Sequence, residues 1–267
     1  FPEVNVDASV AELSATIEQE CDLARERSFY ELFRGSFAGD PDIFIPQTYS
    51  EISTHEVLVT EFVKARTFQE FVDSSSVSER REVARKLFKL LGCYNQNGLL
   101  VGDTHRGNLF VLDDGRLAAI DFGYAEHYPP DRAMHWRNIS RAAINGSEPE
   151  LREGLKAIGY LDGVPDTQDL GLAELLKAVQ SVFNLHQPTS INKEKLEGLM
   201  RALTVGSQLR KFVRFDVRDV RILRNFVSLM GLLTDLDVED VWGKLALQYF
   251  APPDDSLDSL RVSGRSA

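Results

Sequence analysis

Residues 103–123 hold the side chains whose types and spacing suit a chemical reaction. Asp103 is followed five positions later by Asn108, and Asp121 opens the triplet Asp-Phe-Gly. Mg²⁺ prefers hard oxygen ligands and keeps phosphate oxygens in its coordination shell, so Asn108 and Asp121 are candidate metal ligands. Asp103 is a candidate for orienting an attacking hydroxyl or accepting its proton. The pattern therefore predicts phosphoryl transfer from a bound nucleotide, with ATP and Mg²⁺ as cofactors.

The sequence between Asn108 and Asp121 predicts how these two residues meet. Two apolar runs, Leu109–Leu112 and Leu117–Ile120, flank the turn Asp-Asp-Gly at 113–115, which is typical of a β-hairpin. Strand pairing would bring the two candidate ligands together. The alternative is an ordinary hairpin flanked by two surface acids, because Asp-Phe-Gly alone is a common tripeptide. The compound pattern favours the metal site.

Composition limits the partners that this chain suits. It has 267 residues, 43% of them apolar, which is enough for a buried core. The net charge of −11, without Lys and Arg runs interleaved with aromatics, argues against nucleic acid. The stretch Arg201–Arg224 is locally basic; we interpret it as a solvated helix face, with a membrane-facing patch as the alternative.

Cysteine content and hydropathy indicate the cellular compartment that suits this chain. Cys21 and Cys93 have no metal-binding spacing and form no disulfide framework, which favours a reducing, cytoplasmic compartment. No apolar stretch is long enough for a transmembrane segment. Peripheral attachment to a membrane stays open.

The elements that must position the site are short strands followed by a block of helices. Apolar spacing predicts a helix over 9–35, strands at 48–52 and 55–63 paired antiparallel around Ser53-Thr54, and a long helix ending near Gly98. The second strand is expected to be buried. Further helices are predicted at about 131–145, 148–158, 169–184, 192–204, 217–233 and 239–249. Because strands and helices are segregated along the chain, the fold class is α+β.

Four stretches resemble the UbiB/AarF-like atypical kinases, a family linked to coenzyme Q biosynthesis. Residues 46–54, together with 57–63, are similar to the family segment V-P-x-V-x-x-E-L-S-T…V-L-V-M-E. The other three are Glu20-Cys21-Asp22 with Arg25-Glu26, similar to an E-x-D motif and C-helix glutamate; Asp103–Asn108, similar to a D-P-H-P-G-N loop; and Asp121–Gly123 with the helix at 137–143.

The resemblance implies a protein-kinase-like fold entered at its C-helix. Residues 1–63 would form a partial N-lobe with the C-helix and strands 4 and 5. Residues 64–250 would form a helical C-lobe with the catalytic loop, and 251–267 a disordered tail. The resemblance also implies roles for six residues. Glu26 would pair with an ATP-positioning lysine, Glu20 and Asp22 would lie near the nucleotide, Thr60 would be the gatekeeper, and backbone groups of Glu61 and Val63 would bind adenine.

The chain departs from the family pattern at several places. Val101 replaces a histidine before the catalytic aspartate, and Thr104 and Arg106 replace two prolines. The lysine strand, the phosphate loop and the K-x-G-Q motif are expected before residue 1. The chain is therefore predicted to be a fragment of a longer product, or else a degenerate, pseudokinase-like form.

The resulting prediction is a UbiB-like atypical kinase or ATPase that binds Mg-ATP and acts on, or is regulated by, an isoprenoid or quinone-type lipid. The short stretch Tyr124–Asp131, with no Ala-Pro-Glu after it, favours a lipid, a small molecule or water over a protein acceptor. One alternative is a small-molecule phosphotransferase of the aminoglycoside or choline kinase type, which Gly102-Asp103 also fits. Another is a binding module whose helical block at 131–250 contacts a lipid or partner protein.

Overall fold

The computed structural model describes residues 21–203, 211–213, 216 and 219–252. Glu20, the first part of the helix predicted over 9–35, and residues 253–267 of the predicted tail lie outside the described residues. The described part is a mixed α+β structure in which helices dominate, in agreement with the predicted fold class. No helix described here is both long enough and apolar enough to cross a bilayer.

The main sheet is small and has the strand order β1-β5-β4-β2. β4 (Leu109–Val111) and β5 (Leu117–Ala119) pair antiparallel with Leu109 opposite Ala119, which confirms the predicted hairpin. β1 (Ile43–Phe44) adds parallel to β5, and β2 (Arg66–Thr67) adds antiparallel to β4. Two-stranded ladders join β3 (Leu99–Leu100) to β6 (Glu126–His127) and β7 (Thr189–Ser190) to β8 (Glu239–Asp240).

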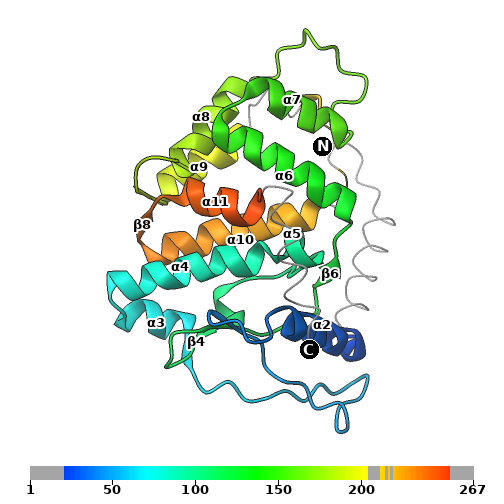
Figure 1. The fold of residues 1–267 in the computed structure, drawn as a ribbon, viewed down its shortest axis with the longest axis vertical. Helices are drawn as coiled ribbons and strands as arrows, with labels where there is room; N and C mark the ends of the chain where they lie inside the picture. The colour runs from blue at the N-terminus through cyan, green and yellow to red at the C-terminus, as the bar shows by residue number, and fades with distance from the viewer. Residues whose placement is uncertain (1–20, 204–210, 214–215, 217–218, 253–267) are drawn as a thin grey trace, which may run out of the picture.

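Helices form the rest of the described chain and confirm the helical block predicted after Gly123. In chain order they are α2 (Leu23–Ser36), α3 (Phe68–Ser74), α4 (Val77–Leu91), α5 (Cys93–Asn97), α6 (Pro130–Asn145), α7 (Glu148–Ala157), α8 (Leu172–Val182), α9 (Lys193–Leu203), α10 (Val220–Leu236) and α11 (Trp242–Phe250). Figure 1 shows α4, α10, α11 and α6 stacked in layers, with α2 and the hairpin at one end.

The long helix predicted to end near Gly98 is divided at Gly92 into α4 and α5. A capping box of Ser76 and Glu79 starts α4, since each side chain satisfies a backbone N–H of the first turn. A Cβ at position 92 would lie 2.7 Å from the carbonyl oxygen of Tyr249, so glycine allows α11 to approach the junction closely. Gly98 ends α5 in a left-handed conformation, as helix ends often require.

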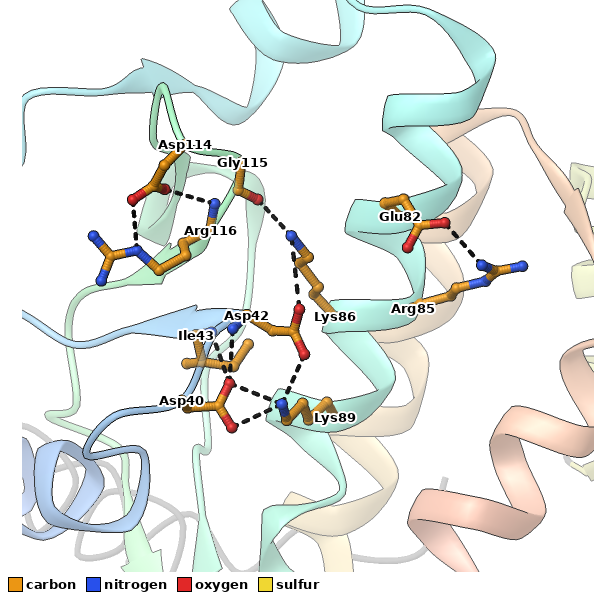
Figure 2. A network of polar contacts seen from close by, with 10 residues as sticks. All are labelled: Asp40, Asp42, Ile43, Glu82, Arg85, Lys86, Lys89, Asp114, Gly115 and Arg116. Carbon is orange, nitrogen blue, oxygen red and sulfur yellow. Dashed lines mark hydrogen bonds and ion pairs between the residues drawn. The ribbon is translucent and has the colours of Figure 1, made fainter.

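Two lysines of α4 hold the sheet against the helices (Figure 2). Lys86 donates from Nζ to the carbonyl oxygen of Gly115 in the hairpin turn at 2.7 Å. Lys89 Nζ lies 2.7 Å from carboxylate oxygens of both Asp40 and Asp42. Burial lowers the pKa of Lys89, but the two carboxylates outweigh it and the pKa is raised overall. These contacts fix the hairpin that carries the candidate ligands.

The prediction of a buried strand over 55–63 is wrong. Its antiparallel partner is as expected, since Tyr49 N–H donates to the Val59 carbonyl at 2.9 Å and Thr48 bridges Thr60. The apolar side chains of the segment are exposed or half-buried, however, and Phe62 is 88% exposed. Among the described strands none extends this pair, and two strands alone cannot bury a face.

The interpretation of 201–224 as a solvated face is wrong at Asp219, which is 0% exposed. Its carboxylate accepts hydrogen bonds from Tyr128 Oη at 2.6 Å and Tyr160 Oη at 2.6 Å. Trp136 Nε1 donates at 3.1 Å, and the Arg132 guanidinium binds both carboxylate oxygens. Burial alone would raise the pKa of Asp219, but these donors hold it below its usual range. The carboxylate ties the start of α10 to α6.

We expect Asp219→Asn to lower the free energy of unfolding by about 3 kcal/mol, because it leaves the buried Arg132 charge with only the more distant carboxylate of Asp216 as a counter-ion. Urea unfolding at pH 7 measures the change. Asp216→Asn is the matched control, since Asp216 also faces Arg132, at 3.7 Å, but is partly exposed. An equal loss in both variants would contradict a special role for Asp219.

The stabilisation by Asp219 is expected to depend on pH. Its folded-state pKa is depressed, so the stabilisation is fully present above the unfolded-state pKa of about 3.9 and is lost as pH falls through the folded-state value. The difference in unfolding free energy between the wild type and Asp219→Asn should therefore be constant from pH 5 to 7 and shrink below about pH 4. A difference that grows on acidification would contradict this.

Candidate active site

The structure places Asn108 and Asp121 at the same end of the β4–β5 hairpin. Asn108 closes a short 3₁₀ turn over Arg106–Asn108, and β4 begins at the next residue. Its carbonyl oxygen accepts from the N–H of Ile120 at 2.9 Å, and Ile120 directly precedes Asp121. The two predicted metal ligands are therefore brought together by ordinary strand pairing.

The Asn108 side chain is buried, with 7% of the residue exposed, and its orientation is fixed. Nδ2 donates to the carbonyl oxygen of Asp103 at 3.3 Å, which links the candidate metal ligand to the candidate catalytic residue. With the nitrogen engaged, Oδ1 is the atom suited to a cation. The neighbouring Thr104 hydroxyl is buried, and no described residue hydrogen-bonds to it.

Asp121 adopts a backbone conformation that is uncommon outside glycine, with φ of 66°. Its N–H donates to Tyr30 Oη at 2.8 Å, and Oδ1 accepts from Gly123 N–H at 3.2 Å. Left-handed residues other than glycine cost roughly 1–2 kcal/mol, and such strain is concentrated at functional sites. The conformation turns the chain sharply between β5 and the following segment.

Phe122 docks the triplet onto α2. Its ring stacks on Phe33 at 4.5 Å between centroids and meets Tyr30 edge-on at 4.7 Å. All three side chains are buried, so the aromatic cluster fixes the distance between α2 and the hairpin. This packing brings the acidic side chain of Glu26 on α2 next to the triplet.

Glu26 on α2 lies beside Asp121. Its Oε1 accepts from Phe122 N–H at 3.3 Å. Burial raises the pKa of Glu26 and the charge of Asp121 raises it further, while the Phe122 hydrogen bond opposes both. Two neighbouring carboxylates favour a cation between or beside them. In the described chain no lysine or arginine pairs with Glu26, so its pairing with an ATP-positioning lysine stays a prediction.

The donor set fits Mg²⁺ bound together with phosphate. Among the described residues no group of three or more His, Cys, Asp or Glu side chains could hold a metal by itself. A site of one amide oxygen and one carboxylate leaves coordination positions for substrate oxygens, as Mg²⁺ in phosphoryl-transfer sites requires.

Asp103 is held by an arginine that the sequence did not point to. Arg224 on α10 contacts its carboxylate, with 2.9 Å between Nη2 and Oδ2. The same guanidinium lies over the Tyr124 ring, 5.1 Å from its centroid. One turn earlier, Arg221 Nη1 lies 2.9 Å from Glu126 Oε2. In the sequence, the basic stretch at 201–224 is what could have indicated these contacts. By itself, however, that stretch predicts a helix face exposed to solvent.

The segment after the triplet is also held from α2. Arg25 donates from Nη1 to the carbonyl of Gly123 at 2.8 Å and from Nη2 to the carbonyl of Ala125. Burial, together with the nearby charge of Arg221, lowers the pKa of Arg25. Arginines from two helices therefore fix residues 123–126 beside the loop at 103–108.

The remaining predicted site residues lie around α2 and the 47–63 segment. Asp22 is the exposed N-cap of α2 and accepts from Arg25 N–H at 3.0 Å. Thr60 is half-buried in its bridge to Thr48. Glu61 uses its N–H for the Gln47 carbonyl, which leaves its own carbonyl as the backbone group for an adenine. Their roles at the nucleotide, and that of Val63, stay predictions.

Residues 1–154 match the family described as the ABC1 atypical kinase-like domain. The chain belongs to this family of atypical kinases, which confirms the resemblance found in the sequence.

Curated relatives match at low identity. The mitochondrial atypical kinase coq-8 of Caenorhabditis elegans is 28% identical over 166 residues, covering 59% of this chain and 22% of that protein. The Synechocystis protein slr1919 is 27% identical over 252 residues, covering 91% and 42%. The chloroplastic protein ACTIVITY OF BC1 COMPLEX KINASE 1 of Arabidopsis thaliana is 22% identical over 252 residues, covering 92% and 36%. The chain thus spans less than half the length of each.

The fold is also found in a solved structure. The Mycobacterium tuberculosis protein Rv3197, determined in complex with erythromycin, superposes with a TM-score of 0.75 at 20% identity, over 94% of this chain and 64% of that one. At this identity the likeness shows that the two proteins share a fold.

Gly102 is a position where the site tolerates no side chain. Its φ is 91°, and a Cβ there would overlap the carbonyl group of Tyr124. We expect Gly102→Ala to lower the free energy of unfolding by roughly 2–4 kcal/mol, since both the left-handed backbone and the overlap oppose it. Urea unfolding measures the change.

Gly163→Ala is the matched control, because it measures the cost of the left-handed backbone alone. Gly163 also has a positive φ, of 77°, but a Cβ there would meet no atom within 4 Å. It should cost about 1–2 kcal/mol. Equal losses in the two variants would show that the backbone at Gly102 and the carbonyl group of Tyr124 do not approach this closely.

Proposed function

We propose that this chain is part of an ATP-dependent atypical kinase or ATPase that binds Mg-ATP through Asn108 and Asp121. The observation that supports the proposal is the backbone pairing of Asn108 with Ile120, which brings Asn108 next to the strand end that continues into the left-handed residue Asp121. The family supports nucleotide-dependent phosphotransfer as the coarse activity. Mg²⁺, when bound, supplies neutralisation of phosphate charge.

In this proposal, Asp103, Arg224 and Asn108 have different roles in the reaction. Asp103 orients the attacking hydroxyl, with its own carboxylate oriented by Arg224. The hydrogen bond from Asn108 Nδ2 to the Asp103 carbonyl couples the metal ligand to that loop, so a change in one displaces the other. Positioning and charge stabilisation then provide most of the rate enhancement.

The N-lobe part of the proposal rests on α2 and the 47–63 segment. Glu26 pairs with an ATP-positioning lysine, Glu20 and Asp22 lie near the nucleotide, and Thr60 limits the depth of the adenine site. The main-chain groups of Glu61 and Val63 bind the adenine. We accordingly propose residues 1–63 as N-lobe and 64–250 as C-lobe, with the nucleotide between them.

The acceptor or regulator that we propose is an isoprenoid or quinone-type lipid. The short Tyr124–Asp131 segment, held by Arg25 and Arg221, offers no evident docking platform for a peptide. A reducing compartment is our proposal for its location, since Cys21 and Cys93 are both free.

We expect Asp121→Asn to weaken Mg²⁺-dependent ATP binding at least tenfold, because it removes the anionic ligand while keeping the size of the side chain. Calorimetric titration of ATP, with Mg²⁺ and with EDTA, measures this. Asp113→Asn, an exposed aspartate in the hairpin turn, should bind as the wild type does. Mg²⁺-dependent binding that is unchanged in Asp121→Asn, or absent from the wild-type chain, would contradict the proposal for this chain.

Asp103→Asn should separate binding from turnover. We expect ATP hydrolysis or transfer to fall by 10²-fold or more, as is typical for loss of a proton-accepting or orienting carboxylate, whereas Mg-ATP affinity stays within about threefold of the wild-type value. Phosphate release and calorimetry on the same preparations test both parts. An equal loss of affinity and turnover would assign Asp103 to metal binding instead.

A further inference from the structure

Arg224 on α10 contacts both chain segments that carry the candidate metal ligands. Its Nη2 lies 2.9 Å from Oδ2 of Asp103, and its guanidinium carbon lies 5.1 Å from the centre of the Tyr124 ring. Asp103 belongs to the loop that ends at Asn108, and Tyr124 directly follows the triplet that begins with Asp121. One positive charge is therefore held between the two parts of the candidate site.

The contacts of Arg224 leave most of its hydrogen-bond donors unused. A guanidinium has five N–H groups, and the Asp103 carboxylate is the one acceptor that Arg224 meets among the described residues. The side chain of Arg224 is 49% exposed, so its other N–H groups are open to a ligand. Their planar, forked arrangement matches two oxygens of a phosphate group, and the positive charge strengthens the pairing.

The neighbouring arginines are already occupied. Arg25 donates from both Nη atoms to main-chain carbonyls, and Arg221 contacts the Tyr124 carbonyl and the Glu126 carboxylate. These contacts hold the segment at 123–126. In the part of the chain that the structure describes, Arg224 alone forms an ion pair with Asp103. Arg224 is therefore the arginine suited to a ligand at this place.

The helix that carries Arg224 is fixed before any ligand binds. Asp219, the residue before α10, is fully buried and accepts from Arg132 and Tyr160. Arg224 follows in the second turn of the helix, and the Tyr124 ring lies against its guanidinium. A charge that is positioned in advance stabilises a transition state without a cost of reorganisation.

We infer that Arg224 is a catalytic residue that binds the terminal phosphoryl group of ATP, while one of its nitrogens keeps Asp103 in place. The inference rests on the proposed function, because it assigns a further residue to the same site. Nothing in it requires that Arg224 bind the metal.

The transfer step defines what Arg224 contributes. The bond between the terminal phosphorus and the bridging oxygen breaks, and its electron pair stays on ADP. The oxygen of the acceptor hydroxyl or of water forms the new bond to phosphorus, and its proton passes to Asp103. Arg224 stays protonated throughout and neutralises the charge that is spread over the phosphoryl oxygens.

Calorimetric titration of Mg-ATP and of Mg-ADP tests the contact on the full chain without depending on turnover. We expect Arg224→Gln to weaken Mg-ATP binding about 5- to 10-fold, because the terminal phosphoryl group loses a charged donor. Mg-ADP lacks that group, so its affinity should stay within about twofold of the wild-type value.

Arg85→Gln is the matched control. Arg85 lies 2.8 Å from the carboxylate of Asp240 and its side chain is 43% exposed, which is close to the environment of Arg224. Figure 2 shows that it points away from the hairpin that carries the candidate ligands. This variant should bind both nucleotides as the wild type does.

A second comparison separates contact with the phosphoryl group from a purely positioning role. Arg224→Gln is combined with Asp103→Asn, so that no carboxylate is left to be oriented. The loss of Mg-ATP affinity caused by Arg224→Gln should be as large in this background, and phosphate release should fall at least a further tenfold. The double variant also removes both charges of the ion pair, which leaves no unpaired carboxylate to disturb folding.

The results that would overturn the inference leave the proposed function intact. They are equal losses for Mg-ATP and Mg-ADP, an equal effect of Arg85→Gln, unchanged Mg-ATP binding in Arg224→Gln, or no loss from that substitution in the Asp103→Asn background. A wild-type chain that binds no Mg-ATP would instead overturn the proposed function for this chain, and the inference with it. The two failures are therefore distinguishable.

Discussion

The buried carboxylate of Asp219 is the interaction on which the arrangement of this molecule depends. A charge removed from water must be paired and hydrogen-bonded, and Asp219 obtains its partners from the chain before α6, from α6 itself and from the turn after α7. Those contacts fix the first turn of α10. The position of that helix then places Arg224 next to Asp103.

Helix α10 contacts two parts of the molecule through different residues. Arg221 and Arg224 contact the Tyr124–Glu126 segment and Asp103. Ile222 and Asn225, which follow Arg221 and Arg224 by one position, line an apolar cavity between the helices of the helical block. Since neighbouring residues of a helix point about 100° apart, one helix can contact polar groups on one side and line an apolar cavity on another.

On the opposite side of the site, the contact between the hairpin and α2 is made by aromatic packing. Phe122 joins the hairpin to α2 through Tyr30 and Phe33. This contact places Glu26 beside Asp121, so that burial and like charge raise the pKa of Glu26. An electronegative centre is thereby built between two elements that are far apart in the sequence, with Lys86 and Lys89 of α4 holding the sheet in place.

The sequence by itself determined the local elements and the family. The hairpin, the pairing of Asn108 with the strand end at Asp121, and the helices after Gly123 follow from turn residues and apolar spacing, which act over short distances. Only the tertiary structure decided that Asp219 is buried, that Arg224 reaches Asp103, and that the 55–63 segment leaves Phe62 exposed. Each of these depends on which distant elements meet. The pattern of charged residues along a helix does not show whether those residues face water or a charged group from a remote part of the chain.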